Sequence, residues 1–251
     1  MANKTYALSD LHGNYEILLE MLKKIRFDDS DRLYILGDCN DRGAHAIEIY
    51  EFIRQHPGNV FLIKGNHELM MRDYLKKNDW TCPQGRIWQS NGGVKTMAEM
   101  DAFLRRGCAS EAEFEEKRRE FCDWFVEYVD TLPSFVELNV DGRDLVLIHA
   151  GINPELPLAE QDEEICAWVR EWFYMSPAIE GKTIIFGHTP ACHLNGGQNF
   201  NIWRDPYYED KIGIDGGLGP FENGQLNCLC LNDMTVTVIK KEEFECEKEA
   251  L

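Results

Sequence analysis

Short apolar runs that end in polar residues recur along this chain. Six runs are rich in β-branched and aromatic side chains, as buried strands are, and they cover residues 4–8, 33–36, 60–63, 144–148, 183–186 and 212–214. Residues 14–26 and 44–55 separate the first three runs and carry apolar side chains at helical spacing. Strands that alternate with helices in this way predict an α/β fold.

The alternation is interrupted between residues 69 and 133. This stretch has helical spacing over 112–129, a charge run over 111–120 that is typical of a solvated helix face, and a turn at residues 91–93. We interpret it as a mostly helical insertion in a single domain that spans residues 1–251, a length compatible with one α/β domain. Further strands are expected over 134–139, 226–231 and 235–239, and residues 240–251 are expected to form a frayed, charged tail.

Composition restricts the kinds of partner that we expect this protein to bind. The formal net charge is −18 over 251 residues, and such an acidic surface disfavours nucleic acid and anionic membranes. The first residues lack the apolar core of a signal peptide, so we expect a cytoplasmic protein with no membrane contact. The nine cysteines are odd in number and are expected to be free thiols. Cys228 and Cys230 would share one face of a strand, as core residues.

Residues that can bind metal ions follow these apolar runs. Oxygen and nitrogen ligands without thiolates suit Mn²⁺, Fe or Zn²⁺, and the set is large enough for two ions. Four of the seven histidines belong to it. The members of the set are Asp10, His12, Asp38, Asn66, His67, His149, His188 and Asp215.

Five motifs carry a family resemblance. The stretches SDLHG, GDCNDRG, GNHE, HAG and GHTP occur in this order between Ser9 and Pro190. Together they resemble the motifs of the calcineurin-like metallophosphoesterases. The DRG and GNHE forms resemble the phosphoprotein phosphatase branch, which includes bacterial and phage serine/threonine protein phosphatases. The resemblance implies a four-layer α/β/β/α sandwich of two mixed sheets.

The resemblance also implies a dimetal centre. Its two divalent ions are expected to be Mn²⁺, with Fe or Zn²⁺ as alternatives. One ion would be held by Asp10, His12 and Asp38. The second ion would share the bridging carboxylate of Asp38, and its ligand set is Asp38, Asn66, His149 and His188.

Catalytic and substrate-binding roles follow from the same resemblance. His67 would be the general acid for the leaving group, oriented by Asp41, and Arg42 would bind the phosphate oxygens. Arg170, in a stretch like the W-x-R of bacterial members, would be a second phosphate clamp. The alternative for Arg170 is a helix arginine whose stem packs beside two tryptophans.

Asparagine side chains complete the expected site. Asn66 would contact substrate as well as metal. Asn91 lies in a stretch that resembles W-x-x-N-G-G, together with Trp88, Gly92 and Gly93, and would bind substrate. The alternative for this stretch is a turn that holds the insertion together. Asp215 would support the wall of the site without binding metal.

The function expected from this resemblance is metal-dependent hydrolysis of phosphate monoesters. The substrate would be a phosphorylated protein, with phosphoserine or phosphothreonine, or a small phosphoester. Three alternatives stay open: a dinucleoside polyphosphate hydrolase, a nucleic-acid-end phosphatase or phosphodiesterase, and a non-catalytic scaffold of the same fold. The scaffold is disfavoured because His67, Arg42 and every expected metal ligand are present.

Overall fold

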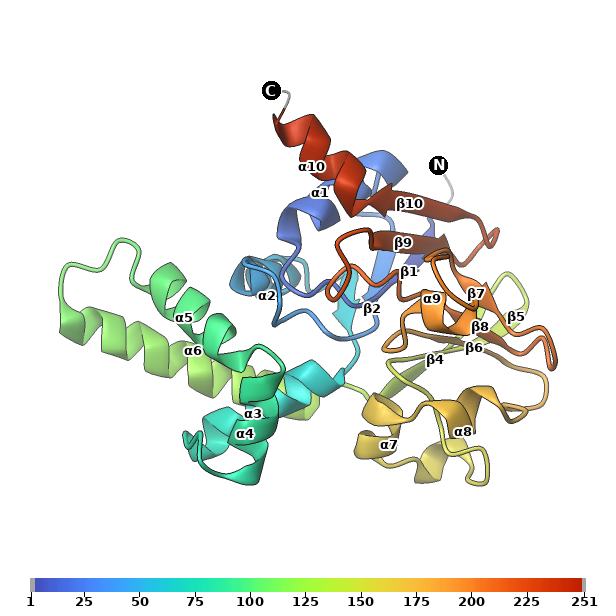
Figure 1. The fold of residues 1–251 in the computed structure, drawn as a ribbon, viewed down its shortest axis with the longest axis horizontal. Coiled ribbons are helices and arrows are strands. Elements are labelled where there is room, and N and C mark those ends of the chain that lie inside the picture. Colours follow the sequence, from blue (N-terminus) through green and yellow to red (C-terminus); the bar gives the residue numbers. More distant parts are fainter. Residues whose placement is uncertain (1–2, 250–251) are drawn as a thin grey trace.

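The computed structural model describes residues 3–249 (Figure 1). The elements follow one another as β1 (Thr5–Leu8), α1 (Tyr15–Ile25), β2 (Arg32–Ile35), α2 (Ala46–Gln55), β3 (Val60–Leu62), α3 (Asn66–Lys77), α4 (Pro83–Ser90), α5 (Gly93–Leu104), α6 (Glu111–Thr131), β4 (Phe135–Val140), β5 (Arg143–Ile148), a 3₁₀ turn (Leu158–Glu160), α7 (Glu163–Trp168), α8 (Glu171–Tyr174), β6 (Thr183–Phe186), α9 (Ala191–Leu194), β7 (Trp203–Arg204), β8 (Lys211–Gly213), β9 (Gln225–Cys230), β10 (Val236–Lys240) and α10 (Lys241–Glu249).

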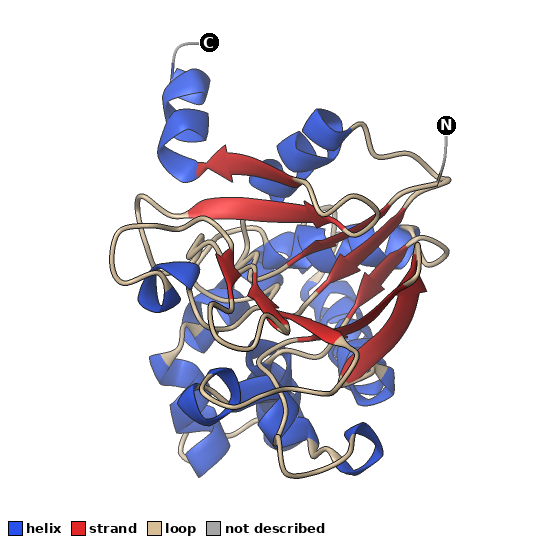
Figure 2. Ribbon diagram, turned by 90° about the vertical axis from the view of Figure 1, so that its right-hand side faces the viewer, coloured by secondary structure: helices blue, strands red, loops and turns tan. Residues whose placement is uncertain are grey.

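The strands form two mixed sheets of five strands each. The first has the order β10-β9-β1-β2-β3, in which β1, β2 and β3 are parallel and β9 runs antiparallel to β1 and β10. The second has the order β4-β5-β6-β8-β7, with β5, β6 and β8 parallel. Figure 2 shows the strands in the middle of the molecule with helices around them. The predicted α/β class is confirmed.

Alternating side chains of the strands explain the four layers. Leu33 and Ile35 of β2 belong to the apolar cluster that also contains side chains of α1, α2 and α3. Tyr34, between them, belongs instead to the cluster between the two sheets. On the far face of the second sheet, Phe186 packs with Phe173 of α8. Helices therefore cover both outer faces, as in the predicted α/β/β/α sandwich.

The region expected to be a helical insertion is indeed helical. Helices α4, α5 and α6 follow α3 and extend away from the sheets (Figure 1). Phe125 of α6 is completely buried and packs edge-on against Tyr50 of α2. These helices are thus anchored on the helical layer of the first sheet, and Trp88 of α4 and Thr96 of α5 contact Asp41 in the loop after β2.

One local expectation was wrong. Residues 241–249 form helix α10, and Phe244 packs against the core cluster of α1 and β10, so this part of the charged tail is not frayed. The aromatic stretch 165–174 is not one helix. It divides into α7 and α8 at Val169, whose backbone is extended, and Arg170 lies at the junction.

The cysteines match their prediction. All nine are free in the part of the chain that the structure describes. Cys228 and Cys230 are both buried in β9. Within residues 3–249, none of the helices has the length and apolarity that crossing a membrane requires.

Candidate dimetal active site

The predicted ligands lie at the carboxyl ends of strands from both sheets. Asp10 and His12 follow β1, Asp38 follows β2, and His149 and His188 follow β5 and β6. β1 is a parallel neighbour of β2, and β5 of β6, so the strand ends of each sheet meet at one edge. Packing of the two sheets then brings both edges together at one site.

Four of these residues have an uncommon backbone conformation. The angle φ is 53° at Asp10, 42° at His12, 59° at Asp38 and 62° at His188. These values lie in the left-handed region, which residues other than glycine rarely adopt. Each strand therefore ends in a sharp turn at its ligand residue. Strained residues of this kind cluster at functional sites, where the surrounding structure holds them in place.

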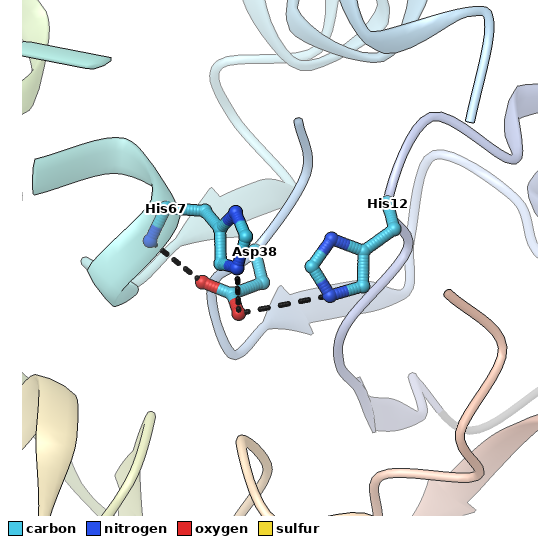
Figure 3. Close-up of side chains that lie close together, drawn as sticks. All are labelled: His12, Asp38 and His67. Carbon is cyan, nitrogen blue, oxygen red and sulfur yellow. Dashed lines mark hydrogen bonds and ion pairs between the residues drawn. The ribbon is translucent and has the colours of Figure 1, made fainter. Parts of the chain in front are cut away.

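Asp38 lies at the centre of the site (Figure 3). Its Oδ2 is 3.8 Å from Nε2 of His12 and 3.8 Å from Nε2 of His67. Its Oδ1 is 3.3 Å from Nε2 of His149 and accepts a hydrogen bond from the backbone N–H of His67 at 3.0 Å. One carboxylate therefore faces three imidazoles, two from the loops after β1 and β5 and one from the first turn of α3, the arrangement expected of a bridging ligand.

Backbone carbonyls set the tautomers of two histidines. Nδ1 of His12 lies 2.8 Å from the carbonyl oxygen of Asn40, and Nδ1 of His149 lies 2.6 Å from that of Leu36. A carbonyl can only accept, so each Nδ1 carries the proton and each Nε2 keeps a lone pair. A metal-binding histidine needs this arrangement, with the distal nitrogen free and the other held by a backbone acceptor.

Two groups of donor atoms are close enough to hold an ion. One consists of His12, Asp38 and His67, and the other of Asp38, His149 and His188. Nε2 of His188 is buried and has no hydrogen-bond partner among residues 3–249. An unpaired buried nitrogen beside a carboxylate fits a metal ligand, because burial without a partner costs free energy.

The two other predicted ligands border the same groups. Asp10 lines the cavity, and its Oδ2 accepts a hydrogen bond from the backbone N–H of His188 at 3.0 Å. The side-chain oxygen of Asn66 lies 2.9 Å from Nε2 of His149. Both residues have an oxygen at the site, so the full predicted set could surround two ions.

Electrostatics favour cations here. Burial is the main cause that raises the pKa of Asp38 well above its usual range, and the neighbouring carboxylate of Asp10 adds to it. Burial also lowers the pKa of His12 and of His188 well below 6.5, so both imidazoles are neutral and can donate lone pairs. Crowded buried carboxylates with neutral imidazoles are stabilised by a bound divalent ion.

A second pair, His67 and Asp41, lies beside the central carboxylate. Nδ1 of His67 is 2.5 Å from Oδ2 of Asp41, which leaves Nε2 directed toward Asp38. Asp41 also accepts hydrogen bonds from Nε1 of Trp88 at 2.9 Å and from the hydroxyl of Thr96. Burial raises the pKa of Asp41 to about 7 in spite of these hydrogen bonds. Helices α4 and α5 thus hold the carboxylate that orients the histidine.

The cavity over these residues has a volume of about 450 Å³, and two arginines, Arg42 and Arg170, line it. NH1 of Arg42 lies 2.6 Å from Nε2 of His12, and NH2 lies 3.4 Å from Nε2 of His67. NH1 of Arg170 donates to the hydroxyl of Thr189 at 3.0 Å. The cavity is lined by Asp10, Asp38, Arg42, Asn66, His67, Asn91, Trp168, Arg170, His188, Pro190, His193, Asp215, Pro220 and Phe221.

The model of the calcineurin-like phosphoesterases matches residues 4–192. This chain belongs to that family. The match covers every predicted ligand and both arginines. Members of the family act through a dimetal centre on phosphoesters, so this phosphoesterase is a metal-dependent hydrolase, and the donor groups around Asp38 are where its ions would bind.

Relatives of this phosphoesterase include symmetrical bis(5'-nucleosyl)-tetraphosphatases. The one from Baumannia cicadellinicola subsp. Homalodisca coagulata is 24% identical over 96% of this chain and 95% of its own length. The one from Erwinia tasmaniensis is 36% identical, over 62% of this chain and 47% of its own length. The first match extends over nearly all of both chains.

Solved structures share the fold. One, provisionally described as a diadenosine tetraphosphatase, has a TM-score of 0.63 at 16% identity and covers 96% of this chain and 94% of its own. A serine/threonine phosphatase from Saccharomyces cerevisiae has a TM-score of 0.54 at 14% identity and covers 95% of this chain and 79% of its own. At these identities the likeness concerns architecture alone.

Glu68 is a site residue that sequence reasoning missed. It is fully buried, and its carboxylate accepts hydrogen bonds from the backbone N–H groups of Asp38, Cys39 and Gly65 at 2.8–2.9 Å, and from the Tyr50 hydroxyl at 2.9 Å. It therefore ties the loop after β2 to the loop after β3. Its place in the GNHE motif was the available signal.

Two predicted residues serve the frame of the site. Asn91 lines the cavity, but its side-chain N–H donates to the Ile87 carbonyl at 2.8 Å at the end of α4, which agrees with the alternative of a structural turn. Asp215 also lines the cavity, and its Oδ1 accepts from the backbone N–H of Gly217 at 2.7 Å. Thr96, which no motif indicated, contacts Asp41 directly.

Proposed function

We propose that this phosphoesterase hydrolyses a phosphoanhydride bond of dinucleoside polyphosphates and releases two nucleotides. The observation that carries the proposal is the match to a symmetrical bis(5'-nucleosyl)-tetraphosphatase over 96% of this chain and 95% of that relative. That substrate class was an alternative from the sequence alone, and it now has more support than a phosphorylated protein.

The proposed ligands are Asp10, His12 and Asp38 for one ion, and the shared Asp38 with Asn66, His149 and His188 for the other. Two bound divalent ions supply a water of lowered pKa at neutral pH and neutralise the charge of the phosphoryl oxygens. The backbone carbonyls of Asn40 and Leu36 keep the two histidines in the required tautomer.

The chain's own groups bind the phosphate and move the proton. Arg42 and Arg170, which both line the cavity, would donate charge-assisted hydrogen bonds to phosphate oxygens. His67 would give a proton from Nε2 to the leaving oxygen as an imidazolium. The Asp41 carboxylate at Nδ1 would balance its charge, which is needed because burial lowers the pKa of His67. These roles keep the sequence-based assignment and give Trp88 and Thr96 a supporting part.

Room for a nucleoside exists beside the phosphate site. Trp168 is 38% exposed and lines both the catalytic cavity and a neighbouring groove of about 690 Å³. A nucleobase gains free energy by stacking on an exposed aromatic ring, since every base has a flat apolar face. A ligand that continues from the phosphates into this groove fits a nucleotide better than inorganic phosphate alone.

The second candidate function is hydrolysis of phosphoserine or phosphothreonine. It is favoured by the position of His67, since an alkoxide leaving group needs a general acid far more than a phosphate leaving group does. The DRG and GNHE forms of the motifs point the same way. Both candidate functions use the same ions and arginines.

One assay separates the candidates. Purified protein loaded with Mn²⁺, Fe²⁺ or Zn²⁺ is incubated with diadenosine tetraphosphate and, separately, with a phosphoserine peptide, and products are followed by chromatography. We expect two ADP molecules for each tetraphosphate, with kcat/KM well above that for the peptide. Faster release of phosphate from the peptide would replace the proposal by the second candidate, and no hydrolysis of either would refute both.

A further inference from the structure

Helix α7 and the junction that follows it provide two residues that line the catalytic cavity. Trp168 is the last residue of α7, and Arg170 follows two positions later, at the junction with α8. Helix α7 has only six residues, so its orientation in the molecule depends on tertiary contacts and not on its own hydrogen bonds. The place of Arg170 therefore depends on what holds α7 to the rest of the molecule.

Glu163, the first residue of α7, accepts hydrogen bonds from two positively charged side chains, Lys64 and Arg72. Its carboxylate accepts from Nζ of Lys64 at 2.9 Å and from the guanidinium of Arg72 at 3.1 and 3.2 Å. The side chains of Lys64 and Arg72 are only 10% and 9% exposed. Lys64 comes two residues before Asn66, and Arg72 lies on α3, which begins with Asn66 and His67.

An open groove separates the rest of α7 from α3 and α4. Its volume is about 690 Å³, with Leu69, Met70 and Ile87 on one side and Ile165 and Val169 on the other. Figure 1 shows α7 beside α4, and the buried Ala167 of α7 belongs to the same apolar cluster as Leu69 of α3. The ionic contacts of Glu163 therefore link the first residue of α7 to α3, in addition to the apolar packing of Ala167.

Like charges oppose this link. Asp73 of α3 and Glu164 of α7 both line the groove, and burial together with Asp73 raises the pKa of Glu164. Without Glu163, this repulsion would favour a wider groove. At its other end, α7 is held by the backbone N–H of Ala150, which donates to the carbonyl of Cys166 at 2.8 Å. Loss of the first link would let α7 pivot about the second.

We propose that Glu163 is a positioning residue: through Lys64 and Arg72 it sets the distance between Arg170 and the residues Asn66 and His67. This inference rests on the proposed function, because it assumes that Arg170 binds the phosphate of the substrate. Glu163 touches neither substrate nor metal ligand, so its effect on the reaction must pass through Arg170.

A double-mutant cycle tests this coupling with p-nitrophenyl phosphate as the substrate. Arg170→Ala should lower kcat/KM by about 10- to 100-fold, the worth of a charge-assisted hydrogen bond. Glu163→Gln should lower it by about 3- to 10-fold and raise the inhibition constant of inorganic phosphate by a similar factor. In the Arg170→Ala background, Glu163→Gln should change kcat/KM by less than about twofold.

The matched control is Asp101→Asn, which removes the ion pair with Nε of Arg118 (2.8 Å) between α5 and α6, away from α7. It should lower Tm with kcat/KM within about twofold of wild type. Glu163→Asp keeps the charge on a shorter side chain, and its kcat/KM should lie between those of the Glu163→Gln variant and the wild type. It replaces Glu163→Gln in the cycle if that variant does not fold.

Two results would overturn the inference: losses in the two single variants that multiply in the double variant, or a lower Tm for Glu163→Gln with unchanged kcat/KM and phosphate inhibition. If the wild-type protein hydrolyses no phosphoester at all, the proposed function fails instead. The wild-type control therefore distinguishes the two failures.

Discussion

His67 illustrates how the role of one side chain depends on the leaving group. Its Nδ1 is held by Asp41, so Nε2 is the nitrogen that can give a proton to the substrate. His67→Asn should lower kcat for a phosphoserine peptide by roughly 10²–10⁴. The loss for p-nitrophenyl phosphate or diadenosine tetraphosphate should be much smaller, because their leaving groups are weaker bases. Steady-state rates on all three substrates measure this.

The control is His45→Asn, a change at a half-buried histidine that precedes α2 and contacts Glu48 rather than the site. It should leave all three rates within about twofold. Metal content is measured for both variants. Equal losses on the three substrates at full metal content would show that His67 is not the acid.

Glu68 gives a prediction about stability. Glu68→Gln replaces an anion that accepts from three backbone N–H groups by an amide whose own N–H group would face one of these donors. We expect a loss of roughly 2–3 kcal/mol in the free energy of unfolding, measured by urea denaturation. Tyr50→Phe removes a single hydrogen bond to the same carboxylate and should cost about 1 kcal/mol. Equal losses in the two variants would contradict the role given to Glu68.

The sequence predicted the residues of the site better than their partners. Asp38 and His149 could be placed together because both end apolar runs, and a strand end has a defined edge. Thr96 and Glu68 could not be placed in this way. Their contacts with Asp41 and with the Asp38 loop depend on how α3 and α5 pack, and helical spacing does not specify which neighbour a polar side chain meets.

At the scale of elements, the contact between α5 and α2 should make stability depend on pH. Glu99 of α5 accepts from the backbone N–H of Ile47 at 3.4 Å, near the start of α2. Burial raises the pKa of Glu99 from 4.5 to about 7, although the backbone hydrogen bonds oppose this. The folded state therefore keeps a proton that the unfolded chain releases between about pH 4.5 and 7, so stability is lost as pH rises through this window.

Glu99→Gln removes this titration and keeps an oxygen for Ile47. Compared with wild type, its Tm should be little changed at pH 4.5 and higher by about 2–6 °C at pH 8. Thermal melts across this range measure the difference. Glu116→Gln, at an exposed position of α6, is the control and should show no such trend. A constant difference at all pH values would refute the assigned titration.

Elements were predicted well where one pattern dominates and poorly where tertiary contacts decide. The strand over 183–186 and the helix over 14–26 were found almost to the residue. No element was predicted over 165–174, where the aromatic residues face different partners: Phe173 is fully buried against Phe186, whereas Trp168 and Trp172 are 38% and 44% exposed. Strand β7 has only two residues, too few for a periodic signal.

For the whole molecule, metal binding should stabilise the folded state. The candidate donors come from both sheets, so the unfolded chain cannot present them together. Adding Mn²⁺ to chelator-treated protein should raise Tm by several degrees, and the bound metal should approach two ions per chain. Scanning calorimetry measures the change in Tm, and elemental analysis measures the number of bound ions per chain.

His188→Ala removes an unpaired buried nitrogen of the site and should reduce the bound metal by about one ion. His56→Ala changes another histidine, whose Nδ1 bonds to the carbonyl of Phe52 at the end of α2. It should bind as much metal as wild type. Full metal binding by the His188→Ala variant would show that His188 is not a ligand.

The four layers could be predicted through the resemblance, whereas periodicity alone indicated only an α/β class. The reason is that two packed sheets bury both faces of their strands: Leu33 and Tyr34 are equally apolar, although they point to different layers. The hydrophobic pattern of such a run does not indicate to which of the two sheets its strand belongs.

The return of the last two strands to the first sheet has a consequence for synthesis of the protein. β9 covers one edge of β1, yet it follows β1 by more than two hundred residues. During synthesis, all the candidate metal ligands are present once the chain has reached His188. The backbone groups at that edge of β1 stay unpaired until residues 225–230 have been added. A chain that stops at residue 224 should therefore contain the complete chemistry of the site and still aggregate.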